Sequence, residues 1–175
     1  MQFTPLQHAQ RRRGGSAFQQ HVAIPAAKQA GERIHHNIAS KWLNELSERE
    51  QEARIFDIAN QFNAGRNVIT DAAQRTRLFL INVRAGQRAK EATAYSTALH
   101  YLRMAMELKP AACWSQLPVE TARLFLLAAE VAFLSKEFDP MEDWIEELLA
   151  HRSARLEQVA ALKIRQAHAM CAQLV

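Results

Sequence analysis

The amino-acid sequence predicts an all-α fold, an antiparallel array of helix hairpins, and three observations support this prediction. Only 5 Gly and 5 Pro occur among the 175 residues, and 49% of the residues are hydrophobic, a composition typical of helical proteins. Apolar residues recur at helical spacing along most of the chain, and no stretch alternates with period two for long enough to predict a strand. Two stretches share one pattern of small and aromatic residues, which indicates repeated hairpins.

Residues 1–31 are predicted to be an irregular, basic segment ahead of a helical domain at 32–175. Residues that interrupt helices recur in it: Pro5, Gly14, Gly15, Pro25 and Gly31. One short helix, Ala17–Ile24, fits between them. The segment carries Arg11–Arg13 and Lys28 and no acidic residue, which accounts for the whole net charge of +4. Three arginines attract phosphates only weakly and the remaining charges balance, so we expect no nucleic-acid partner.

Two helices are expected between about residues 28 and 65. The first ends at Leu46, and its apolar face at i, i+4 spacing consists of Ile34, Ile38, Trp42 and Leu46. Ser47 and Glu50 form a capping box that begins the second helix. The apolar face of that helix consists of Ile55, Ile58, Ala59 and Phe62, and Gly65 lies close to its end.

Five further segments complete the array. Asp71 caps a helix that reaches Ala89, and a helix over 92–108 is stopped by Lys109-Pro110. An irregular link containing Cys113 and Trp114 follows, and we interpret Trp114 as a plug between helix pairs. Helices are then expected over 118–134, from Asp139-Pro140 onward, and over 154–174.

Residues 85–110 and 128–151 share a hairpin pattern. Each places small residues in a first helix, an aromatic residue just past the turn, and apolar residues 3, 7 and 10 positions later. In the first copy the packing residues are Gly86, Ala89, Tyr95, Ala98, Leu102 and Ala105, and in the second they are Phe138, Met141, Ile145 and Leu148. The first copy resembles a tetratricopeptide repeat, in which small residues let two helices approach closely. The pattern therefore predicts a degenerate tetratricopeptide-like α-solenoid, with a generic helix bundle as the alternative.

Residues 51–102 resemble the helical-repeat segment that follows the AAA-type ATPase module in large bacterial hybrid sensor histidine kinases with a serine/threonine-kinase-like domain. The matching residues are Ile55–Asn63, Gly65, Ile69–Asp71, Ala85-Gly86, Ala89-Lys90 and Ala92–Leu102. A looser similarity covers about residues 17–170. The resemblance implies that residues 1–31 are a remnant of the end of an ATPase module. It also implies that the chain is a fragment of a two-component signalling protein, truncated in its last hairpin.

The sequence contains no motif for catalysis, and the resemblance carries over no catalytic residue. No phosphate-binding glycine loop, nucleophile elbow or zinc-ligand spacing occurs, so we expect no enzyme activity and no cofactor or metal. His35 and His36 are adjacent on a helix and point about 100° apart, which disfavours a shared ion. The acids Glu142-Asp143 and Glu146-Glu147 are interpreted as a solvated stripe. The alternative is an ATPase remnant that completes an ATP site in trans.

The expected function is a non-catalytic interaction or linker module in signal transduction. Its partner would be a protein: a peptide, a helix or a neighbouring signalling domain. The candidate partner-binding residues on the first helices of the hairpins are Asn82, Arg84, Gln87, Arg88 and Arg123, followed by Glu130 and Leu127. The last helix exposes Val159, Leu162 and Ile164, which predicts self-association.

A cytoplasmic setting is expected from three features. No apolar run reaches the ~18 residues that a membrane span needs. The arginines near the N-terminus are not followed by the apolar core of a secretory signal. Cys113 and Cys171 form no CxxC motif, and such isolated thiols are typical of a reducing compartment.

Overall fold

The computed structural model describes residues 26–151 and 155–172, and every regular element in these two ranges is a helix. The elements are α1 (Ala26–Glu45), α2 (Glu48–Ala53), α3 (Ile55–Ala64), the 3-10 helix η1 (Arg66–Val68), α4 (Ala72–Glu91), α5 (Tyr95–Leu108), α6 (Cys113–Gln116), α7 (Pro118–Leu134), α8 (Phe138–Ala150) and α9 (Arg155–Ala172). The all-α prediction is confirmed. The short helix predicted at Ala17–Ile24 lies outside the described residues.

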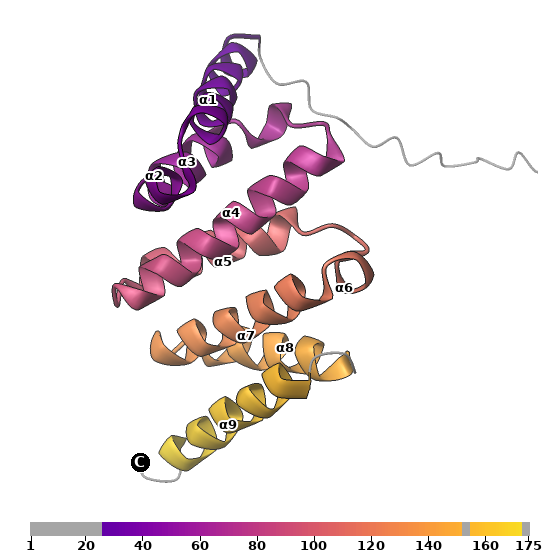
Figure 1. The fold of residues 1–175 in the computed structure, drawn as a ribbon. Helices are drawn as coiled ribbons and strands as arrows, with labels where there is room; N and C mark the ends of the chain where they lie inside the picture. Colours follow the sequence, from indigo (N-terminus) through magenta and orange to yellow (C-terminus); the bar gives the residue numbers. More distant parts are fainter. Residues whose placement is uncertain (1–25, 152–154, 173–175) are drawn as a thin grey trace, which may run out of the picture.

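Helices that follow one another in the chain pack against one another. α4 pairs with α5 and α7 pairs with α8, while α3 lies between α1 and α4, and α5 packs on α7. Figure 1 shows these pairs as successive layers of a stack, with α1 at one end and α9 at the other. α9 closes the stack by packing on both α7 and α8. Most contacts thus join helices that are neighbours in the chain. The buried residues of all the layers form one continuous core.

α1 begins directly after Pro25, so residues 26–31 of the segment predicted to be irregular are helical. The predicted apolar face of α1 is wrong at Ile34, whereas Trp42 packs against the core and Ile38 and Leu46 are half-buried. Ile34 is 60% exposed, whereas Ala39 and Leu43 are buried. The helix packs on α3 and η1 with the side that carries Glu32, Ala39 and Leu43. Apolar spacing alone did not identify the buried side, because α1 offers apolar residues on two sides and is covered on only one.

The capping box at the start of α2 is confirmed. The Ser47 backbone N–H donates to Glu50 Oε2 at 2.9 Å, and the Glu50 backbone N–H donates to Ser47 Oγ at 3.4 Å. The hydrogen bonds from the Ser47 hydroxyl and then from the Ser47 backbone hold the pKa of Glu50 below the usual glutamate value. The single helix predicted over this region is two helices. The chain bends at Arg54 (φ −109°, ψ 19°), whose guanidinium lies 5.5 Å from the centre of the Trp42 ring.

Two close contacts join α3 and its C-terminal glycine to neighbouring helices. A Cβ atom on Gly65 would lie 2.7 Å from the Glu32 carbonyl oxygen and 2.8 Å from the His36 backbone nitrogen, so α1 touches the backbone here. Two residues earlier, Asn63 exchanges two hydrogen bonds with Asn82, from Nδ2 to Oδ1 in each direction, of 2.8 and 2.9 Å. Both amides are buried, so the α3–α4 contact has a polar centre within an apolar surround.

The hairpin of α4 and α5 places the first set of predicted packing residues at its centre. Asp71 Oδ2 accepts the Gln74 backbone N–H at 2.8 Å, which confirms the predicted N-cap of α4. A Cβ atom on Gly86 would lie 2.6 Å from Leu102 Cγ, so the glycine makes room for the leucine. Three further residues of the set are buried: Ala89, Ala98 and Ala105. Tyr95 is half-buried and packs against the core.

The hairpin of α7 and α8 encloses larger side chains. Met141, Ile145 and Leu148 of α8 are each 0% exposed, and so are the small residues Ala128 and Ala132 of α7, the helix on which α8 packs. Phe138, at the start of α8, keeps 37% exposure and stacks on His168 of α9 with ring centres 4.1 Å apart. Phe138 is therefore a contact between α8 and α9 as well as a residue of the hairpin.

The same turn closes both hairpins. In the first, the Ala94 N–H donates to Ala89 O at 2.9 Å and the Thr93 N–H to Lys90 O at 2.8 Å. In the second, the Glu137 N–H donates to Ala132 O at 2.9 Å and the Lys136 N–H to Phe133 O at 3.1 Å. This pair of bonds defines the Schellman motif. Its left-handed residue is Thr93 (φ 57°) in one turn and Lys136 (φ 60°) in the other.

Replacing the left-handed residue by glycine should stabilise the protein. A non-glycine residue in this region costs roughly 1–2 kcal/mol, most for a β-branched side chain, and glycine gives back part of this gain through its freer unfolded chain. Thr93→Gly should therefore raise the free energy of unfolding, measured by urea denaturation, by about 0.5–1 kcal/mol. Ala92→Gly, one residue earlier at φ −83°, should lower it. Equal effects of both substitutions would contradict the turn geometry.

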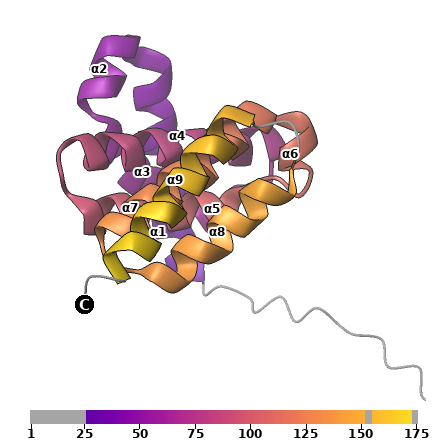
Figure 2. The same cartoon turned by 90° about the horizontal axis from the view of Figure 1, so that it is seen from below.

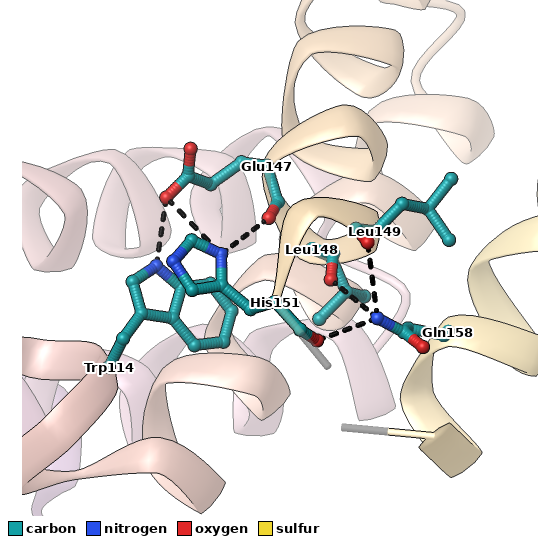
Figure 3. Close-up of polar contacts among 6 residues, drawn as sticks. All are labelled: Trp114, Glu147, Leu148, Leu149, His151 and Gln158. Carbon is teal, nitrogen blue, oxygen red and sulfur yellow. Dashed lines mark hydrogen bonds and ion pairs between the residues drawn. The ribbon is translucent and has the colours of Figure 1, made fainter. Parts of the chain in front are cut away.

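A side-chain cluster joins α6, the end of α8 and the start of α9 (Figure 3). The Trp114 ring stacks between Phe125 and His151, with ring centres 5.4 and 3.9 Å away, and its indole N–H donates to Glu147 Oε1 at 2.8 Å. His151 Nδ1 lies 2.9 Å from the Glu147 carbonyl oxygen, an acceptor, so the ring nitrogen donates. The printed contacts of Trp114 join α6 to α7 and to the end of α8, which belong to one hairpin, so its role as a plug between helix pairs stays a prediction. The irregular link around it contains the short helix α6.

Gln158 ties α9 to the C-terminus of α8. Its Nε2 donates to the carbonyl oxygens of Leu148, Leu149 and His151 at 3.1, 3.3 and 2.6 Å, as Figure 3 shows. The last carbonyls of a helix have no partner within the helix, so this amide supplies one from the next element. Near the other end of α8, Arg165 Nε donates to Glu142 Oε2 at 2.6 Å. Glu142 and Glu147 are thus hydrogen-bonded and half-buried. Of the acidic stripe predicted to be solvated, only Asp143 and Glu146 are exposed.

Candidate functional site

Two adjoining hollows lie between the exposed sides of α4 and α7. The first, of about 260 Å³, is lined by Glu52, Val83, Arg84, Gln87, Arg88, Glu91 and Arg123. The second, of about 220 Å³, is lined by Gln87, Lys90, Glu91, Arg123, Leu126, Leu127 and Glu130. Gln87, Glu91 and Arg123 line both hollows. We call the two together the α4–α7 groove.

The groove has an apolar floor and a charged rim. Val83 and Leu127 contribute to the lining although only 5% and 7% of each is exposed, and Leu126 is half-buried. Arg84, Arg88 and Arg123 are exposed. An apolar strip between charged edges is typical of protein-binding surfaces, in which a buried centre is surrounded by a polar rim.

Most charges on the rim are paired within the groove. Arg84 forms an ion pair with Glu52 of α2, and Lys90 Nζ lies 2.6 Å from Glu130 Oε2, which joins α4 to α7. Within α4, Arg88 lies 3.6 Å from a carboxylate oxygen of Glu91. The pairs of Arg84 and Arg88 are exposed and contribute about 0–1 kcal/mol each, so a ligand can replace them at small cost. The Lys90–Glu130 pair is half-buried.

Arg123 differs from the other cations of the groove. Its guanidinium donates to the neutral side-chain oxygen of Gln87, whose Nε2 donates in turn to Glu91 Oε1 at 3.0 Å. Among the described residues Arg123 has no carboxylate within ion-pair distance. It stands where the two hollows meet and keeps hydrogen-bond donors available there.

The structure brings four of the five predicted partner-binding residues together in this groove: Arg84, Gln87, Arg88 and Arg123. The prediction that Asn82 lies on the binding surface is wrong. Asn82 is 0% exposed and is occupied by Asn63 and by the Leu78 carbonyl oxygen. It is two residues from Arg84, and on a helix that spacing turns a side chain to a different face. Leu127 and Glu130, expected on this face, also line the groove.

Sequence reasoning missed several lining residues. Glu91 could have been found, because it follows Gln87 and Arg88 by four and three positions on one helix face. Lys90 and Leu126 lie in the second hollow, and no pattern in the sequence singled them out. Glu52 belongs to α2, more than 30 residues before Arg84, and only the packing of the layers brings these two side chains together.

The histidines that invited a metal hypothesis make separate contacts. His35 Nδ1 lies 2.6 Å from Gln61 Oε1, and His36 Nε2 lies 3.0 Å from Gln74 Oε1. Within residues 26–151 and 155–172, no group of three or more His, Cys, Asp or Glu is arranged to hold a metal ion. Neither histidine lines the groove.

The described residues thus define an all-helical domain in which adjacent helix pairs carry a charged groove along one side. Comparison of the chain with protein-family models, with curated proteins and with solved structures finds no match. None of the described helices combines the length and the apolar character that crossing a bilayer requires.

Proposed function

We propose that this protein is a non-catalytic interaction module whose α4–α7 groove binds a segment of a partner protein. The observation that carries the proposal is the convergence of exposed side chains from two first helices, α4 and α7, on adjoining hollows with an apolar floor. A peptide or helix laid along them would bury apolar surface at the centre and exchange charge pairs at the rim.

A degenerate helical repeat explains why α4 and α7 present equivalent sides. The two hairpins close with the same Schellman turn, and Ala89 and Ala132 hold the same position in it. Tyr95 and Phe138 follow the turn at the same step, and Leu102 and Ile145 lie buried at the same distance beyond them. These correspondences favour a tetratricopeptide-like array over a bundle with unrelated helix pairs.

The resemblance of residues 51–102 to hybrid sensor kinases supports a role in cytoplasmic signal transduction. In that setting the module links an ATPase domain to a sensor domain, or receives a helix from one of them. The partner would then be a neighbouring signalling domain, and the groove would transmit its position through the stacked layers.

The groove can be tested without a known partner. Peptides selected from a phage-displayed random library on the immobilised full chain should bind the Arg84→Ala/Arg88→Ala variant at least about tenfold more weakly, because two rim contacts are lost. Circular dichroism and the melting temperature should not change beyond the small effect of surface ion pairs. The matched control is Arg103→Ala, which removes a similar exposed ion pair, to Glu137, outside the groove.

Three outcomes would contradict the proposal. Library selection could yield no binder, the double variant could bind as tightly as the wild-type chain, or Arg103→Ala could weaken binding as much as the double variant does.

A melting assay with Mg·ATP tests the alternative function, an ATP site, because a ligand bound only by the folded state raises the melting temperature. We expect no shift, and stabilisation by several degrees would favour the ATP site.

A further inference from the structure

The outer side of α9 carries four of the eight large hydrophobic residues that are exposed on the described helices. Leu156, Val159, Leu162 and Met170 are 83%, 53%, 48% and 58% exposed, while Ala161 is the only fully enclosed residue of this helix. Seen from below the stack, α9 is the element nearest the viewer and runs diagonally across the other layers (Figure 2). Exposed apolar residues gathered along one helix mark an interaction site.

The charge on this side of α9 is positive. Arg155 and Lys163 are exposed between the apolar residues, and no carboxylate of the described residues pairs with them. Glu157, the one acidic residue of α9, is half-buried on another side. A partner that covers this surface must therefore supply carboxylates.

The exposed side of α8 supplies them. Asp139, Asp143 and Glu146 are exposed at i, i+4 and i+7, which places them on one face of the helix, and none of them forms an ion pair with a described residue. Asp143 and Glu146 are the members of the predicted acidic stripe that Arg165 and Trp114 leave unbound, and Asp139 extends the exposed row by one turn.

The two stripes lie side by side on one surface. The contact between Glu142 and Arg165 marks the seam between α8 and α9. Glu146 follows Glu142 by one turn and Leu162 precedes Arg165 by almost one turn, so both border this seam, and both are exposed. We call this surface the α8–α9 face. Within one chain the acidic stripe of α8 and the basic stripe of α9 both face outward, so their charges do not pair with each other.

We propose that the α8–α9 face is the interface of a homodimer with two-fold symmetry. A two-fold axis that runs along the seam places α9 of each copy on α8 of the other copy. The basic and apolar stripe of α9 then meets the acidic stripe of α8 twice. Packing of α9 on α9 alone would oppose Lys163 to the cations of its own stripe, which like-charge repulsion disfavours. Leu162, beside the seam, contacts its symmetry mate and is covered together with Val159. The interface is separate from the α4–α7 groove, so the two proposals can fail independently.

Sedimentation velocity of the full chain tests the interface. At about 100 µM, above the micromolar dissociation constant expected for a small interface, the wild-type chain should sediment with twice its 19.9 kDa mass. Lys163→Glu should weaken dimerisation at least about tenfold, and so should Asp143→Lys, because each opposes like charges across the interface. Lys28→Glu, at the opposite end of the stack, is the matched control and should leave the dimer unchanged.

Combining Lys163→Glu with Asp143→Lys should restore the dimer, since the exchange recreates opposite charges in both symmetric contacts. Loss of folding cannot imitate this recovery. A monomeric wild-type chain at all concentrations, single variants that dimerise as well as the wild-type chain, or a double variant that is no better than either single variant would overturn the proposal.

Discussion

Gly65→Ala should lower the free energy of unfolding by about 3 kcal/mol, although alanine fits the local backbone. Gly65 has φ −96° and ψ 9°, which any residue adopts, so the cost comes from contact alone. The new methyl group would lie 2.7 and 2.8 Å from backbone atoms of Glu32 and His36, and these atoms cannot rotate away as a side chain can. α1 must move outward, which opens the buried contacts of Ala39 and Leu43.

Urea denaturation and thermal melting measure this effect, and the melting temperature should fall by roughly 6–10 °C. Gly31→Ala is the matched control. Gly31 lies inside α1 and has no atom within 4 Å of the added methyl group, so the higher helix propensity of alanine should stabilise the chain by about 0.5–1 kcal/mol. Unchanged stability of Gly65→Ala would mean that α1 does not approach α3 as closely as described.

Removing one member of the Asn63–Asn82 pair should cost about 2–3 kcal/mol. In Asn82→Ala the buried Asn63 amide loses its partner and the Leu78 carbonyl oxygen loses a second contact. An unsatisfied buried polar group costs about 1–3 kcal/mol, and a small cavity adds to this. Asn63→Ala should behave in the same way, because the two hydrogen bonds are reciprocal.

The double variant Asn63→Ala/Asn82→Ala separates the hydrogen bonds from the cavity. With both amides gone no polar group is left without a partner, so its loss of stability should fall short of the sum of the single losses by at least about 1 kcal/mol. Asn37→Ala, an exposed asparagine on α1, should change stability by no more than about 0.5 kcal/mol. Additive losses in the pair would show that the two amides act separately.

Most helix boundaries could be predicted because local chemistry sets them. Ser47, Asp71 and Pro118 begin helices where the sequence predicts, and Lys109-Pro110 ends one. These signals act over three or four residues and need no knowledge of the rest of the chain. The bend at Arg54 was missed because no glycine or proline marks it.

The side of a helix that becomes buried depends on its neighbours, and here prediction was less successful. Ile34 is exposed although it has the expected spacing, because α1 is covered only on the side of Ala39 and Leu43. Asn82 was expected on the surface because it lies on the first helix of a hairpin, yet its side chain is buried and Asn63 on another helix satisfies it. Ala98 and Leu102 are buried, in agreement with the pattern, since both sides of their hairpin are covered.

The candidate site could be predicted in part for the same reason. Arg84, Gln87 and Arg88 share one helix, so their spacing was sufficient to group them. Joining Arg123 to them required the hairpins to stack in register, which the shared pattern of small and aromatic residues suggested. Glu52 and Lys90 needed the actual packing, because ion pairs between helices leave no periodic signal in the sequence.

Partner binding in the α4–α7 groove is tested most directly by locating a library-selected peptide on the folded chain by amide chemical-shift mapping with nuclear magnetic resonance. If the partner binds in the α4–α7 groove, the largest shifts should fall on Arg84–Glu91 of α4 and Arg123–Glu130 of α7, with the signals of α1 and α9 nearly unchanged. Shifts confined to α9, or spread evenly over all layers, would contradict the assignment of partner binding to the α4–α7 groove.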